Sequence, residues 1–303
     1  MIDRFQLLYE LQDSDSDWSV KRNYLSYNPY LTTEQIDLLY PDESVDKIGL
    51  AQFPKLTDEQ FMRFFNDKVV NKKNLAKNPH LTPEQIDLLY DAGGDKESLA
   101  QYPKLTNEQF MRFFNDEDFN KGYLAQNPHL TPEQIDLLYF AGVDSFKRYL
   151  AEYSKLTEEQ FMRFFNDEDF DKDHLTRNPN LTTEQIDLLY QTEGADKGSL
   201  ARFPKLTNPQ FMRFFNDKEV WIINYLAQNP NLTPKQIDLL YRTERVDNDY
   251  FKNYLAEYPK LTDEQFLRAF NDGLKYKLRL TTNPSLNSNT KYSFASGVFN
   301  WKW

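Results

Sequence analysis

The chain has 303 residues and a formal net charge of −11, from 36 basic and 47 acidic residues. It contains no cysteine, which excludes disulfides and thiolate metal sites. An acidic surface repels a phosphate backbone. No apolar run approaches the roughly 18 residues of a membrane helix, and the polar N-terminus lacks the apolar core of a signal peptide. We therefore expect a cytoplasmic protein that binds neither duplex nucleic acid nor a membrane.

The dominant pattern is the motif L-T-x-x-Q, followed by a short apolar run, which recurs about every 25 residues. Residues 1–27 precede the repeats and are predicted to cap them, because a terminal repeat must cover the apolar face of its neighbour. Self-similarity at this period is typical of a solenoid. The motif begins at Leu31, Leu56, Leu81, Leu105, Leu130, Leu156, Leu181, Leu206, Leu232 and Leu261.

Two forms of the motif alternate along residues 28–272. One reads N-P-x-L-T-x-x-Q-I-D-L-L-Y, as at residues 78–90, and the other reads K-L-T-x-x-Q-F-M-R-F-F-N-D, as at residues 104–116. Together they make five double repeats of about 50 residues. Residues 273–303 hold a degenerate last repeat and a basic, aromatic tail. The final alternation of this tail predicts a short strand or an extended peptide.

Each repeat carries the signals of a helix start. Thr82 is a good N-cap, Pro83 suits the first helical position, and Gln85 completes a capping box. The apolar residues that follow lie at i, i+3 and i+4, on one helical face. A second short element, such as residues 97–102, precedes a proline, and one or two turns of α or 3₁₀ helix fit there. The sequence predicts an all-α solenoid of about ten to eleven short helical units.

The residues L-A-x-N-P-x-L-T-P-E-Q-I-D-L-L-Y, at 124–139, resemble the variant leucine-rich repeat. This resemblance covers nearly the whole chain and implies a right-handed superhelix of alternating α and 3₁₀ helices without strands. The phenylalanine-rich form departs from the family pattern. One type of family member carries an iron–sulfur cluster on N-terminal cysteines, which this chain lacks. The family has no common activity, so the resemblance implies a fold and no function.

Motifs for catalysis or cofactor binding do not occur in the sequence. It contains no G-x-S-x-G, no P-loop and no G-x-G-x-x-G. The three histidines share no ligand spacing and are interpreted as surface residues. Two recurring sets favour ion pairs between repeats over a catalytic pair in a cleft. We expect no enzyme, no cofactor and no metal. The histidines are His80, His129 and His174, and the recurring sets are Asp87, Asp136, Asp187, Asp238 and Arg112, Arg163, Arg213, Arg268.

Two acidic clusters are candidates for a partner-binding surface. They lack the ligand spacing of a calcium-binding loop. Solvated helix ends are the simpler explanation. Stacked in adjacent double repeats, however, the clusters would form an acidic stripe that attracts a basic partner. The clusters are Asp116, Glu117, Asp118 and Asp167, Glu168, Asp169.

Tryptophans supply the remaining candidates. The motifs are nearly identical from copy to copy, whereas the joints between them vary, and such joints often line the binding face of a solenoid. Trp221 lies in one joint. It is best explained as a core residue, with a partner-contacting aromatic as the alternative. Trp301 and Trp303, in the tail, would either cover the last repeat or anchor a partner.

The charge distribution ranks the functions that the sequence allows. Residues 273–303 carry five basic and no acidic residues, and subtracting these from −11 leaves −16 on the rest of the chain. The leading expectation is a non-enzymatic protein-binding repeat scaffold or inhibitor that masks its protein partner sterically and electrostatically. The alternative is an acidic nucleic-acid mimic, of the phage anti-defence type, that blocks a basic DNA- or RNA-binding protein. A helical-repeat DNA-processing enzyme is a second alternative, but it needs a basic concave face that the charge opposes.

Overall fold

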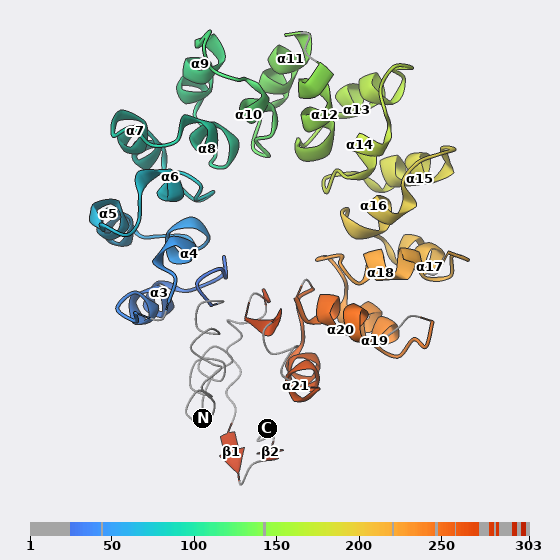
Figure 1. The fold of residues 1–303 in the computed structure, drawn as a ribbon. Helices are drawn as coiled ribbons and strands as arrows, with labels where there is room; N and C mark the ends of the chain where they lie inside the picture. The colour runs from blue at the N-terminus through green and yellow to red at the C-terminus, as the bar shows by residue number, and fades with distance from the viewer. Residues whose placement is uncertain are drawn as a thin grey trace. The chain divides into compact units, whose positions relative to one another are not determined.

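The computed structural model describes residues 25–43, 45–141, 144–219, 221–245, 248–257, 259–272, 279–281, 283–284, 293–295 and 298–300. These residues form nineteen helices and one two-stranded sheet (Figure 1). The predicted helical class is confirmed. The strand predicted in the tail is also present, since β1 (Ser293–Ala295) pairs antiparallel with β2 (Val298–Asn300). The predicted capping region lies outside the described residues apart from 25–27.

Ten helices of the described chain begin directly after the threonine of the repeated motif, and we call them motif helices. In each one the threonine hydroxyl accepts from the backbone N–H of the motif glutamine, whose side chain accepts from the N–H of the threonine. The predicted capping box is confirmed in all ten. The motif helices are α3 (Thr33–Leu39), α5 (Asp58–Asn66), α7 (Pro83–Asp91), α9 (Asn107–Asn115), α11 (Pro132–Phe140), α13 (Glu158–Phe165), α15 (Thr183–Gln191), α17 (Asn208–Phe215), α19 (Pro234–Tyr241) and α21 (Asp263–Asn271).

The nine other helices connect the motif helices, and we call them joint helices. The described residues include no 3₁₀ helix, which corrects the alternation that the resemblance implies. Aspartate N-caps, such as Asp95, start several joints, and i→i−4 bonds such as that from Tyr102 N to Ser98 O follow. The joint helices are α4 (Lys47–Gln52), α6 (Lys72–Leu75), α8 (Lys96–Gln101), α10 (Gly122–Ala125), α12 (Asp144–Tyr153), α14 (Asp173–Thr176), α16 (Lys197–Arg202), α18 (Trp221–Leu226) and α20 (Asn248–Glu257).

The core is built from the same positions of every repeat. In α9, for example, Phe110 and Phe113 are buried, and in α7 Ile86 and Leu89 are buried. The joint helices add a leucine–alanine pair, as at 99–100. Each of these apolar residues belongs to the helical face that the sequence periodicity predicts. Burial of large rings and aliphatic chains is the main stabilising contribution to such a stack.

One kind of contact links the two motif forms within a double repeat. The buried Gln160 of α13 donates through Nε2 to Pro132 O and to Asp136 Oδ1 of α11, at 2.9 Å each. Arg163 donates to the same carboxylate at 2.9 Å. The predicted ion pairs between the recurring aspartates and arginines are therefore confirmed. The corresponding pairs are Asp37–Arg63, Asp87–Arg112, Asp187–Arg213 and Asp238–Arg268.

A second kind of contact links consecutive joint helices through a buried asparagine. Asn127, after α10, donates through Nδ2 to Ala100 O and Pro103 O, which follow the core leucine of α8, at 2.7 and 2.8 Å. Asn178, Asn229 and Asn283 repeat this geometry. Its side-chain oxygen also accepts from the backbone two residues later, as at His129 N. The double period of the sequence thus corresponds to two different polar contacts.

The structure comprises two compact units. Unit 1 contains Met1–Val70 and Leu232–Trp303, and unit 2 contains Asn71–Asn231. In unit 2, the joint helices α8 to α18 lie on the concave side of an arc and the motif helices lie on the convex side (Figure 1). The surface formed by these six joint helices, which we call the joint surface, is where the sequence varies most between repeats.

Candidate functional site

The joint surface of unit 2 is continuous. Each of its helices contacts the next, from α8 through α10, α12, α14 and α16 to α18. The leucine of each joint and the small residue after it, which is alanine in five joints and Thr176 in α14, face the core, whereas the neighbouring positions differ from copy to copy. The residue before the core leucine is Ser98, Tyr123, Tyr149, His174, Ser199 and Tyr225 in the six joints. A variable surface is thus carried on a nearly invariant frame.

Three large aromatic side chains of the joint surface are exposed. Tyr102, Tyr153 and Trp221 are 38%, 43% and 45% exposed. Tyrosine, tryptophan and arginine are the residue types enriched at protein–protein hot spots. Arginines lie among these rings: the guanidinium of Arg148 lies 4.8 Å from the ring centre of Tyr149, and that of Arg202 lies 4.9 Å from that of Phe203.

Trp221 is not a core residue, which corrects the leading prediction for it. Ile222 and Ile223 of α18 fill the core instead, and both are fully buried. The reason is register. Trp221 stands four residues after Asp217, where Asn120 follows Asp116, and Asn120 is exposed. Alignment of the joints from that aspartate would have revealed this position in the sequence.

The ring of Trp221 packs against two neighbouring residues of the joint surface, Tyr225 and Gly198. It lies edge-on to Tyr225, with ring centres 5.7 Å apart. A Cβ added at Gly198 of α16 would lie 2.7 Å from the Trp221 ring atom Cζ3. In α8 and α12, the position two residues before the core leucine, which is Gly198 in α16, holds Glu97 and Arg148. A side chain at this position would displace the indole, so the packing of Trp221 against α16 requires the glycine.

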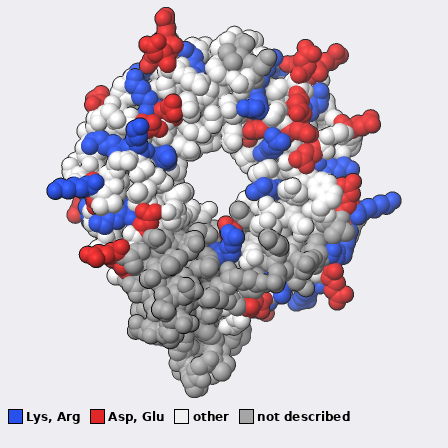
Figure 2. Space-filling model, in the orientation of Figure 1, with Lys and Arg blue, Asp and Glu red and all other residues white. Residues whose placement is uncertain are grey.

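The acidic clusters lie on the segments after α9 and α13. The first carboxylate of each cluster forms an ion pair with a lysine. Asp116 and Asp167 are half-buried and accept from Lys96 at 3.4 Å and Lys147 at 3.1 Å. The hydrogen bond from Lys147 lowers the pKa of Asp167, against the effect of burial. The second and third acids of each cluster are exposed. Acidic side chains gather near α9 and α13 in Figure 2, with basic side chains interspersed over the visible face.

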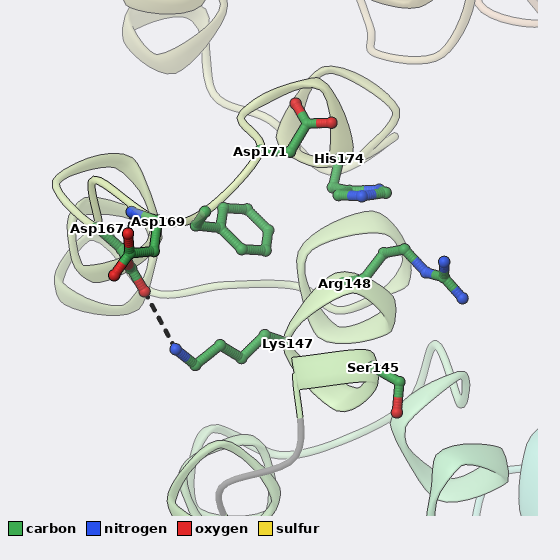
Figure 3. A pocket seen from close by; sticks show the side chains of 8 residues that line it. Ser145, Lys147, Arg148, Asp167, Asp169, Asp171 and His174 are labelled. Carbon is green, nitrogen blue, oxygen red and sulfur yellow. Dashed lines mark hydrogen bonds and ion pairs between the residues drawn. The ribbon is translucent and has the colours of Figure 1, made fainter.

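A pocket of about 410 Å³ lies beside the second acidic cluster (Figure 3). Its walls come from α12, from the segment after α13 and from α14, and they combine opposite charges with one aromatic ring. The ion pair of Lys147 with Asp167 crosses one wall. The lining residues are Ser145, Lys147, Arg148, Asp167, Asp169, Phe170, Asp171 and His174.

His80 and His129 are exposed, as predicted for surface residues, whereas His174 is not. It is half-buried, and its Nδ1 lies 2.6 Å from Glu152 Oε1. Arg177 donates to the same oxygen at 3.0 Å. Glu152 thus ties α12 to α14 within the joint surface. This contact was missed in the sequence because its histidine occurs at this position in one repeat alone, although Arg279 and Glu257 form a related ion pair in the last one.

In the described part of the chain, no three or more histidine, aspartate or glutamate side chains are placed so that they could hold one metal ion. Nor does any helix within it have the length and apolarity needed to cross a membrane. Trp301 and Trp303, the remaining predicted partner-binding residues, lie outside the described residues. No protein-family model, no curated protein and no solved structure matches this chain.

Proposed function

We propose that this protein is a non-enzymatic, cytoplasmic protein-binding repeat scaffold, and that its protein partner binds the joint surface of unit 2. The fold proposed with this function is a right-handed α-solenoid of ten to eleven units, related to the variant leucine-rich repeats. The motif helices and their polar contacts provide the frame. The joint helices, which differ in every copy, provide the recognition.

The observation that carries this proposal is the set of partly exposed aromatic rings on the joint surface. Tyr102, Tyr153 and Trp221 lie on α8, α12 and α18 or at their ends, and arginines lie between them. Rigid rings gain contact area on binding at a small cost in side-chain entropy. Their surroundings on the frame are fixed by buried asparagines and leucines, so little ordering is needed on association.

The mechanism proposed is masking rather than turnover. A partner held against the joint surface loses access to its own binding face, and the exposed acids after α9 and α13 add a field that attracts a basic partner. Such a field accelerates association and depends on ionic strength, whereas the aromatic contacts set the lifetime of the complex.

The nucleic-acid mimic is the second candidate, and the chain's net charge of −11 favours it. In that case the exposed acids would replace phosphates in the cleft of a DNA- or RNA-binding protein. The two candidates differ in their response to salt. Binding between exposed charges weakens strongly when the Debye length falls, whereas contacts between buried rings persist.

Affinity capture from a lysate of the native host, at low salt and at about 0.5 M salt, tests the proposal. Mass spectrometry would identify the retained proteins. A protein retained at high salt by the wild-type chain, and lost with a Tyr102→Ala, Tyr153→Ala, Trp221→Ala triple variant, supports the scaffold. A nucleic-acid-binding protein that is released by high salt and is still bound by the triple variant would instead support the nucleic-acid mimic.

A further inference from the structure

The first repeat of the chain contacts its last repeat within unit 1. Asn28 donates through Nδ2 to Thr281 O at 2.7 Å, across a separation of 253 residues. Both residues are buried. Their neighbours Leu25 and Leu280 are also buried. Residues from opposite ends of the sequence therefore share one core.

This contact has the register of two consecutive repeats. Asn127 binds the carbonyl of the residue after the core leucine of the preceding joint helix, namely Ala100, which follows Leu99. Thr281 follows Leu280 in the same way. Asn28 also accepts from Tyr30 N at 2.8 Å, as Asn127 accepts from His129 N. The last repeat thus takes the place that a preceding repeat takes elsewhere.

The first repeat is packed on its other side as well. An added Cβ at Gly49 of α4 would lie 2.6 Å from the hydroxyl of the buried Ser26. The segment around Asn28 is therefore held between α4 and the last repeat. In most repeat proteins the terminal repeats need a polar outer face, whereas the described segment around Asn28 has a neighbour on both sides.

The contact between the ends is weaker than its counterparts by one hydrogen bond. Each of Asn127, Asn178, Asn229 and Asn283 donates to two carbonyls. Within the described residues, Asn28 donates only to Thr281 O. A buried hydrogen bond contributes to the stability of a joint, so a joint with one fewer opens more readily.

We infer that the first and last repeats bind each other as a head-to-tail joint, in the register of consecutive repeats, and that this joint opens before the joints of Asn127, Asn178, Asn229 and Asn283. The open state separates the segment around Asn28 from the segment around Leu280. It is a conformer that a ligand with a preference for either free end would select. The joint itself lies within unit 1, and the inference is independent of the proposed function.

Hydrogen–deuterium exchange of the full-length chain tests the joint. In the wild type, peptides covering 25–40 and 279–281 should exchange faster than peptides covering Ala151 and Asn178. The Asn28→Ala variant should increase the exchange rate about tenfold in both terminal segments, because one buried hydrogen bond between them is lost. Asn28→Ser is the milder variant, to be used if the alanine variant loses helix content.

Two matched variants separate a joint from a local effect. Asn178→Ala removes the same kind of contact within unit 2, and should accelerate exchange near Ala151 but in neither terminal segment. Thr281→Ser retains both the side-chain hydroxyl and the backbone carbonyl that accepts the bond, and should leave the exchange of residues 25–40 unchanged. If Asn28→Ala accelerates exchange near residue 28 while 279–281 stays as in the wild type, the inference is wrong. Faster wild-type exchange at Asn178 than at the ends would also contradict it.

Discussion

The buried glutamines of the two motif forms give the sharpest test of how the repeats are held together. Gln134 of α11 and Gln160 of α13 complete the same capping box with a threonine, and both are buried. Of these two glutamines, only Gln160 also donates to the preceding motif helix, where Pro132 O and Asp136 Oδ1 accept. The Gln134→Ala variant is therefore a control for the loss of the cap itself.

We expect the Gln160→Ala variant to lose about 2 kcal/mol more free energy of unfolding than Gln134→Ala, since each hydrogen bond contributes roughly 1 kcal/mol. For a chain of 303 residues the difference corresponds to about 3 °C in the melting temperature, since the unfolding entropy is about 2.1 cal/mol/K per residue. Urea denaturation and thermal melting, both followed by circular dichroism, measure it. Equal losses in the two variants would refute the reasoning, because they would show that the contacts between motif helices add nothing beyond the cap.

Three further predictions follow from the same contacts. Gln210 donates to Asp187 and lowers the pKa of this carboxyl. The ionised Asp187 therefore stabilises the fold above the unfolded pKa of about 4, and this stabilisation is lost as the pH falls further. Asp187→Asn should flatten the profile of stability against pH in this range, and an unchanged profile would contradict this. Ile222→Ala should cost roughly 2–5 kcal/mol in unfolding free energy and Trp221→Ala less than half as much, because only the isoleucine is fully buried. Gly198→Ala should displace the Trp221 ring and shift the tryptophan fluorescence, and an unchanged spectrum would show that the glycine does not position the ring.

Much of the fold could be predicted because its signals are local. The threonine and glutamine of a capping box are three residues apart, so Thr82 and Gln85 announce the start of α7 without reference to any other repeat. The recurrence of Asp87 and Arg112 at one repeat's distance likewise predicts their ion pair. Copy-to-copy identity makes each of these predictions a prediction for the whole array.

Two features were not predicted from the repeat pattern, one because of a change in spacing and one because it joins distant parts of the sequence. The joint of Trp221 has one more residue between its first aspartate and its core leucine than the joint of Tyr123 has. An extra residue rotates a helix by about 100°, so it decides which side chain is buried. The contact of Asn28 with Thr281 joins the two ends of the sequence. A repeat pattern defines each neighbouring contact but gives no information about how the first and last copies meet.

The tyrosine that ends each I-D-L-L-Y motif illustrates a structural role that could be mistaken for a site. Tyr40 lies between the cationic groups of Lys47 and Arg63, and its hydroxyl donates to Asp67 at 2.5 Å. Burial and this hydrogen bond raise the pKa of Tyr40 to about 12. Tyr90 has the same cationic neighbours, Lys96 and Arg112, at 5.1 and 4.5 Å. A constellation that recurs in each double repeat stabilises the frame rather than marking one functional place.

The affinity of the captured partner for two matched variants tests the central proposal most directly. Trp221, on the joint surface, and Leu137, on the convex motif helix α11, are 45% and 43% exposed. Isothermal titration calorimetry should show that Trp221→Ala weakens binding by about tenfold or more, as expected for a hot-spot aromatic, while Leu137→Ala changes the Kd by less than about twofold. Loss of binding with Leu137→Ala and unchanged binding with Trp221→Ala would place the partner on the motif helices and contradict the account.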